Sequence, residues 1–433
     1  MDKQLIKYIK AHYQKKFAGR TFVPGKTHIP ASGKAFDSRE MVAMTEAVLD
    51  GWWTEGRFAA AFESELANFL GVEHCITTNS GSSANLLAVS ALTSLHLGKR
   101  RLRPHDEVIT VAAGFPTTIN PLILYRLIPV FIDIDLKTLN IDVNKLEHAV
   151  SPRTKAVFLP HNLGNPFNVE AVKKICRKHN LWLIEDCCDA LGSKYQNRYV
   201  GAFGDLATLS FYAAHHITTG EGGAVVTSNA KLASIVRSFR DWGREYWFRT
   251  GEDVKRDHGL GSHRRGELPA DYDTKFIFSE IGFNLRLTDM QAALGLIQLS
   301  KLPKFIKHRK NAYAFLLKEL EPFKKFLIFQ EPEKYGDPAW FGFLLTVKTE
   351  SPFKRQDLVA CLNSHNIGTR MFMAGNLTKQ PYMRAYRVKF KSGDLSNTDY
   401  VLKNSVWIGV HQGIDQPRLS YMVKVLKTFL SRF

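Results

Sequence analysis

Short, fully apolar segments rich in β-branched residues recur through the first half of the chain, and helical patterns separate several of them. The expected strands are residues 75–78, 108–111, 130–134, 156–159, 182–184, 208–211 and 224–227, and the expected helices between them are 82–92, 168–178 and 231–239. Strands that are apolar throughout and are separated by helices form mainly parallel sheets covered on both faces. The pattern therefore predicts an α/β fold.

The length of 433 residues suffices for one large domain and one smaller domain. We expect an N-terminal helical extension over residues 1–28, a large domain over 29–322 and a small α+β domain over 323–433. Asp37 and Glu40 form a capping box before an apolar-periodic stretch at 41–49, which predicts a helix. Helical periodicity returns at 288–299, and a long basic helix follows to about 322. The polar, Gly-rich segment 243–275 is expected to be a long excursion from the core.

The formal net charge of +18 is compatible with a nucleic acid, a membrane surface or an anionic small substrate as partner. No nucleic-acid motif accompanies the basic clusters at 3–20 and 255–265, so no nucleic-acid partner is expected. The five cysteines are odd in number and include no C-x-x-C pair, which argues against a disulfide framework or a metal site. The sequence has neither a secretory signal nor a long apolar run, so we expect no membrane span and a cytoplasmic location.

Four segments follow expected strands, at the edge where open α/β sheets bind ligands. Residues 78–85 place Gly81 and Ser82 at a helix start, where backbone N–H groups bind phosphate; an ordinary capped helix is the alternative. Residues 184–190 place Asp186 at the end of a buried strand, where a carboxylate needs a partner such as a protonated pyridine nitrogen. A helix N-cap is the alternative interpretation of Asp186.

The other two segments supply an aromatic ring and a histidine pair. Phe115, within 114–120, could stack on a planar cofactor or belong to the core. The stretch SFYAAHHITTGEGG at 210–223 contains His215 and His216 before a Gly-rich turn. A lone histidine is more often a packed or surface residue, but this neighbourhood favours an acid–base role.

The order of these segments resembles the DegT/DnrJ/EryC/StrS sugar aminotransferase family of the aspartate aminotransferase fold, from about residue 29 to the C-terminus. That family acts on nucleotide-linked keto sugars. Its third segment reads S-F-x-x-x-K, and the lysine forms a Schiff base with pyridoxal phosphate. His215 occupies the lysine position here, and no lysine lies between Lys194 and Lys231. SFYAAHHITTGEGG, VITVAAGFPTTINP, LWLIEDCCDALGS and GFNLRLTDMQAALGLIQL resemble a narrower group, the 3-dehydratases of 3,6-dideoxysugar biosynthesis, and above all the CDP-4-keto-6-deoxy-D-glucose 3-dehydrases.

This resemblance implies a homodimeric enzyme that uses pyridoxamine or pyridoxal phosphate to remove the 3-hydroxyl from a nucleotide-linked 4-keto-6-deoxyhexose. Such products enter O-antigen, lipopolysaccharide or other glycans. The implied roles are His215 as the catalytic base, Phe115 as the stacking ring, Asp186 as the partner of the ring nitrogen, and Gly81, Ser82 and Ser210 as phosphate ligands. Asn284 would reach the phosphate of a neighbouring subunit, and His216 and Asp189 are candidate pocket residues.

Two other readings of the resemblance stay open. The chain could be similar to the GDP-4-keto-6-deoxymannose 3-dehydratases, which regenerate the cofactor amine from glutamate rather than relying on a reductase. It could also be a relative of the nucleotide-sugar aminotransferases that binds the cofactor without catalysis. The sequence does not select the nucleotide or the stereochemistry of the hexose.

The cysteine pattern yields a prediction about iron. Relatives in the narrower group hold a 2Fe–2S cluster on four cysteines. The first aligns with Cys188, and the others fall at Tyr246, Phe248 and near Arg256; no cysteine lies between 189 and 360. Because one thiolate cannot hold such a cluster, protein purified anaerobically should contain only trace iron. About two iron atoms per chain in a metal assay would contradict this expectation.

Overall fold

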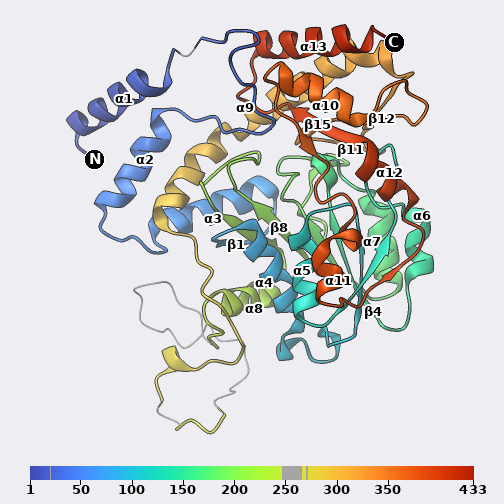
Figure 1. Ribbon diagram of the computed structural model, residues 1–433. Coiled ribbons are helices and arrows are strands. Elements are labelled where there is room, and N and C mark those ends of the chain that lie inside the picture. Colours follow the sequence, from blue (N-terminus) through green and yellow to red (C-terminus); the bar gives the residue numbers. More distant parts are fainter. Residues whose placement is uncertain (20, 246–265, 270–271) are drawn as a thin grey trace.

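The computed structural model describes residues 1–19, 21–245, 266–269 and 272–433, and an eight-stranded sheet lies at its centre (Figure 1). The sheet order is β1-β9-β8-β5-β4-β2-β3-β14. Its strands are β1 (His74–Thr78), β2 (Glu107–Val111), β3 (Ile128–Ile132), β4 (Thr154–Pro160), β5 (Trp182–Asp186), β8 (Leu206–Ser210), β9 (Gly223–Thr227) and β14 (Lys391–Ser392). Within this sheet β9 pairs antiparallel with β1 and β8, and the other pairs are parallel. The predicted mainly parallel α/β sheet is confirmed.

Helices cover both faces of this sheet. One face packs against α4 (Gly81–Thr93), α5 (Pro116–Leu124) and α8 (Ala230–Arg240), and the other against α3 (Arg57–Leu70), α7 (Val169–Lys178) and α9 (Asp289–Leu320). Neighbouring residues of one strand, such as Val108 and Ile109, belong to different buried clusters because successive side chains point to opposite faces. Because both faces of this sheet are buried, the sequences of its strands are apolar throughout.

A second, antiparallel sheet of order β10-β12-β15-β13 lies toward the C-terminus. Its strands are β10 (Leu327–Phe329), β12 (Gly342–Val347), β13 (Arg370–Met371) and β15 (Ser405–Gly409), and it packs against α10 (Arg355–Ser364) and α13 (Gln416–Leu430). Figure 1 shows α9 as a long gold helix that passes from α2 (Ser38–Leu49) and α3 to the C-terminal helices. Phe305 of α9 joins the core of the large sheet, whereas Leu316 joins the core of the smaller one.

The remaining elements are short or peripheral. They are α1 (Lys3–Phe17), α6 (Val143–Leu146), α11 (Pro381–Ala385), α12 (Ser396–Asn404), and a small sheet of β6 (Lys194–Tyr195), β7 (Arg198–Tyr199) and β11 (Gly336–Asp337). Among the described residues, none of the helices has the length and apolar character needed to cross a bilayer.

The structure confirms one predicted helix start and corrects several other element bounds. The predicted capping box of Asp37 and Glu40 is present at the start of α2. The strand predicted at 130–134 is Ile128–Ile132, because Asp133 turns to bind the start of α12 through the backbone N–H of Asn397 and Thr398. The two helical stretches after 288 form one continuous helix, α9, which contains Pro303.

Part of the predicted organisation stays a prediction. Most of the predicted excursion at 243–275 lies outside the described residues, as do Tyr246, Phe248 and Arg256. The domain boundaries at 28/29 and 322/323 also stay a prediction, and the core of the smaller sheet includes Ile29 and residues of α9.

Candidate active site

A cavity of about 390 Å³ lies at the carboxyl ends of the central strands. Asp186 ends β5, Ser210 ends β8, and Phe115 follows β2 as the N-cap of α5. The smaller sheet supplies the opposite wall. The cavity-lining residues include Gly81, Ser82, Asn85, Phe115, Thr118, His161, Asp186, Asp189, Ser210, His215, Phe341, Arg370, Met371, Met373 and Trp407. Of the nine residues predicted from the sequence, seven therefore meet in one cavity, and His216 and Asn284 do not line it.

Asp186 is held in place by hydrogen bonds from three directions. Its Oδ2 accepts from Asn85 Nδ2 at 3.1 Å and from Thr118 Oγ1 at 2.7 Å, and its Oδ1 accepts from the Cys188 N–H at 3.1 Å. The side chain is only 6% exposed. A buried carboxylate fixed in this way is a preorganised partner for a cationic ring N–H, because the donors around it hold its oxygens in one orientation.

Close backbone packing builds an anion cradle beside this carboxylate. Ser80 caps α4 by accepting from the Ser83 N–H, so the first turn of the helix begins at Gly81 and Ser82. A Cβ atom at Gly81 would collide with Ser210, and one at Gly223 would lie 2.5 Å from the Ser80 carbonyl. Glycine at both positions lets the helix N-terminus approach the end of β8. Free N–H groups and serine hydroxyls there suit a phosphate.

His215 faces the cavity from the loop between β8 and β9, with Asp189 behind it. His215 Nδ1 lies 3.4 Å from Asp189 Oδ1, and the two side chains are 15% and 17% exposed. Burial, with the nearby Arg309 cation, lowers the pKa of His215 to about 3. Burial and the Asp186 carboxylate raise the pKa of Asp189 to about 8, so the close pair is not a fully charged ion pair near pH 7.

Arg309 and His216 fix the loop that carries His215. The fully buried Arg309 of α9 donates to the carbonyl oxygens of Trp340 at 3.2 Å, Phe341 at 3.1 Å and His215 at 3.4 Å. His216 is fully buried and its Nε2 lies 2.6 Å from the Ala339 carbonyl oxygen. His216 thus points away from the cavity, and the structure favours a packing role over a place in the pocket.

Two predicted residues lie at or beyond the rim. Phe115 is 55% exposed although it lines the cavity, so its ring is available for stacking and is not an ordinary core residue. Asn284 is exposed outside the cavity, and its backbone pairs with Asp241. Its predicted contact with a neighbouring subunit stays a prediction.

Sequence reasoning missed several residues of the site. Asn85 lies within segment 78–85 and Thr118 within segment 114–120. A buried carboxylate such as Asp186 needs hydrogen-bond donors, and this need was the signal that could have identified both residues. The wall made by Arg370, Met371 and Trp407 had no such signal, because it arises from the packing of the smaller sheet.

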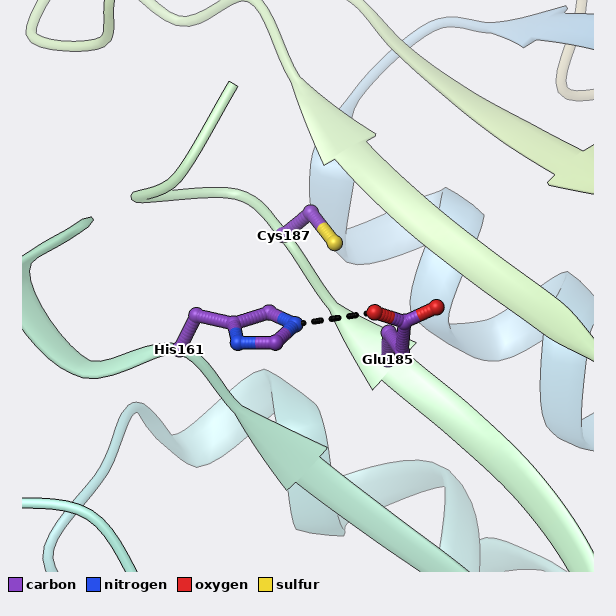
Figure 2. Close-up of side chains that lie close together, drawn as sticks. All are labelled: His161, Glu185 and Cys187. Atoms are coloured by element: carbon purple, nitrogen blue, oxygen red, sulfur yellow. Dashed lines mark hydrogen bonds and ion pairs between the residues drawn. The ribbon is translucent and has the colours of Figure 1, made fainter. Parts of the chain in front are cut away.

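A buried trio, of which His161 also lines the cavity, resembles a metal site (Figure 2). His161, Glu185 and Cys187 place one ligand atom each within 4.8 Å of one another. However, His161 Nδ1 accepts from the Phe167 N–H at 3.2 Å, so the ring is neutral and its Nε2–H donates to Glu185 at 3.1 Å. Burial also raises the pKa of the Cys187 thiol well above its usual range, which disfavours the thiolate that metals bind. Hydrogen bonding therefore accounts for the trio.

This sheet, with its helix N-terminus, buried carboxylate and acid–base residue at the strand ends, defines an enzyme of the aminotransferase fold class. The chain belongs to the DegT/DnrJ/EryC1/StrS aminotransferase family, whose model matches residues 34–427. It is 47% identical over 99% of its length to lipopolysaccharide biosynthesis protein RfbH of Salmonella typhimurium, covering 98% of that protein. It is 44% identical over 97% of its length to dTDP-4-dehydro-2,6-dideoxy-D-glucose 3-dehydratase of Saccharopolyspora spinosa, covering 90% of that protein.

A solved structure of a related enzyme has the same fold. GDP-4-keto-6-deoxymannose-3-dehydratase with a trapped PLP-glutamate geminal diamine superposes with a TM-score of 0.83 at 32% identity. The match covers 92% of this chain and 100% of that one. The predicted family and fold are confirmed.

The Glu185 carboxylate yields a prediction about pH-dependent stability. Burial alone would raise the pKa of Glu185, but hydrogen bonds from His161 and from the Gly201 and Gly204 N–H groups outweigh it and lower that pKa. A depressed pKa stabilises the folded state above the ordinary pKa of about 4.3, and the gain is lost as the pH falls below it. Glu185→Gln should therefore lower the free energy of unfolding at pH 7 by about 2 kcal/mol.

The difference from wild type should shrink by up to about 1 kcal/mol at pH 3.5. Urea unfolding followed by circular dichroism at both pH values measures it. Glu170→Gln, at an exposed position of α7, is the matched control and should change little at either pH. A difference that stays constant or grows toward pH 3.5 would show that Glu185 is not held as a carboxylate.

Proposed function

We propose that this protein removes the 3-hydroxyl from a nucleotide-linked 4-keto-6-deoxyhexose with pyridoxamine or pyridoxal phosphate as cofactor. The observation that carries the proposal is His215, which faces the cavity at the position where the aminotransferases carry lysine. A histidine can move protons but cannot hold the cofactor covalently as lysine does. The dehydratase names of the similar proteins support the same reaction class.

The residues around the cavity suit this cofactor. The N-terminus of α4 with Ser82 and Ser210 would hold the phosphate, and a side chain at Gly81 would fill that space. Asp186 would hold the proton on the ring nitrogen, and the exposed ring of Phe115 would stack on the cofactor. The bound cofactor supplies an amine for the sugar ketone and an electron sink for the adjacent bond cleavage.

The protein's own contribution is proton transfer and orientation. Asp189 lies at Nδ1 of His215, so the working atom is Nε2 on the opposite edge of the ring. Nε2 takes up a proton from the bound reactants and returns it to the 3-hydroxyl, which leaves as water. The wall formed by Phe341 and Trp407 excludes solvent from this step.

The substrate carries a diphosphate, and the described cavity lining contains one guanidinium, that of Arg370. We place the anionic part of the substrate, or of a glutamate amine donor, on this side. Glutamate is favoured over a reductase because a structure similar to this chain holds PLP with glutamate. The proposal includes the homodimer expected from Asn284 and the cytoplasmic location expected from the sequence. The products would enter lipopolysaccharide or a related glycan, as the name of the Salmonella relative suggests.

The direct test is product analysis with CDP-, dTDP- and GDP-linked 4-keto-6-deoxyhexoses. We expect mass spectrometry to detect loss of the 3-hydroxyl with pyridoxamine phosphate, and repeated turnover when glutamate is added. A parallel mixture with a flavin reductase and NADH but no glutamate should give no repeated turnover. Turnover in that mixture alone would refute recycling by glutamate, and no dehydration of any substrate would refute the function.

Replacing the proposed base gives a second prediction. His215→Lys should lower dehydration at least about 100-fold, because a neutral lysine amine can relay the proton to carbon 4 of the sugar instead of to the 3-hydroxyl. It should also attach pyridoxal phosphate covalently, which borohydride reduction and peptide mapping detect at residue 215. Wild-type protein is the control and should yield no such adduct. A variant that retains the wild-type dehydration rate would show that His215 is not the base.

A further inference from the structure

His215 in its surroundings is a poor base on its own. Burial and the nearby Arg309 cation lower the pKa of His215 to about 3, so an isolated ring would hold a proton too weakly for acid–base work near pH 7. General acid–base catalysis is most effective when the pKa of the group lies close to the working pH. Another group must therefore assist His215 if it is to take up and return a proton.

Asp189 is placed to give that assistance. Its Oδ1 lies 3.4 Å from His215 Nδ1, and that nitrogen is buried without a hydrogen bond. Catalytic contacts of this kind are often long in ligand-free structures and shorten when the reactants bind. Asp189 also lines the cavity at the side of His215, so both members of the pair meet the bound reactants.

The charged and titratable groups around the pair come from several elements. They are Arg309 on α9, Asp186 at the end of β5, and Cys188, Tyr212 and His216 in the adjoining loops. Burial raises the pKa of Cys188 and lowers that of His216, so both of these side chains are neutral near pH 7. Burial lowers the pKa of Arg309 to about 9, so Arg309 is a cation near pH 7, and Asp189 is the carboxyl group that lies beside Nδ1 of His215.

We infer that Asp189 is a positioning residue that shares one proton with His215 and thereby makes Nε2 of His215 an effective acid and base. This inference rests on the proposed function, in which His215 performs the proton transfer. When the pair holds the shared proton between Asp189 and Nδ1, Nε2 also carries a hydrogen, which it can donate to the leaving hydroxyl. When the pair has lost this proton, the Asp189 carboxylate accepts a hydrogen bond from Nδ1–H, and the lone pair of Nε2 faces the cavity.

Proton balance is complete within the pair and the substrate. Nε2 gains one proton from the bound reactants, and Asp189 stabilises the resulting imidazolium through Nδ1–H. The same proton then passes from Nε2 to the departing 3-hydroxyl, which leaves as water and restores the pair. No oxidant, reductant or metal enters these steps.

The first test reads the histidine directly. Full-length protein labelled with [15N]histidine is titrated by NMR with and without pyridoxamine phosphate, and His215→Gln assigns the signal. In wild type, the ring nitrogens of His215 should respond near pH 8, where Asp189 titrates. In Asp189→Asn that response should vanish, because an amide cannot release a proton. Asp205→Asn, at a half-buried carboxylate outside the cavity, is the matched control and should leave the response intact.

The second test is the pH profile of kcat. Asp189→Asn should lower kcat roughly 10–100-fold with little change in KM and should lose the limb near pH 8. Asp189→Glu should restore part of the rate together with the limb, which a purely structural role would not do. If no substrate is dehydrated, the proposed function fails while the NMR titration still decides the pairing. If Asp189→Asn keeps the response of His215 near pH 8 or the wild-type profile, the inference is overturned.

Discussion

The site depends on two successive carboxylates at the end of β5. Glu185 and Asp186 are adjacent in a strand, so their side chains point to opposite faces of the sheet. Glu185 is anchored on one face by His161 and by the N–H groups of Gly201, Phe203 and Gly204. Asp186 projects into the cavity on the other. Buried carboxylates need hydrogen-bond donors, and the donors of these two come from five different segments of the chain.

This arrangement couples the fold to the chemistry. The donors of Asp186 are Asn85 of α4 and Thr118 of α5, so one carboxylate fixes the two helices that also carry Gly81 and Phe115. The anchoring of Glu185 holds the loop before β8 and thus the strand that ends at Ser210. A shift of β5 would therefore disturb together the residues proposed to hold the phosphate, to stack on the cofactor and to bind the ring nitrogen.

The sequence predicts the large sheet and the residues at its strand ends well, because the sequence patterns that indicate them involve only a few neighbouring residues. Apolar runs, the capping box at Asp37 and small residues at strand ends each reflect a few neighbouring residues, and the structure confirms the sheet and the convergence of the strand-end segments. Element ends are less predictable. Asp133 leaves β3 to bind the start of α12, a contact that joins positions more than 260 residues apart. The wall containing Arg370 and Trp407 is hidden from the sequence for the same reason.

The buried Arg309 explains why a histidine at position 215 creates a different site from a lysine. Arg309, whose pKa burial lowers to about 9, places a positive charge close to residue 215 near pH 7 and donates to its carbonyl oxygen. A nearby positive charge disfavours the lysine ammonium, so a lysine there would give up its proton, and the neutral amine could react with the aldehyde of pyridoxal phosphate. A histidine beside the same arginine is instead neutral, unattached and able to exchange protons through either edge of its ring. In the proposed function no covalent link holds the cofactor, so its position depends on the contacts proposed for the α4 N-terminus, Asp186 and Phe115, together with the other phosphate ligands. The precision of those contacts then sets whether the reacting carbon lies within reach of Nε2.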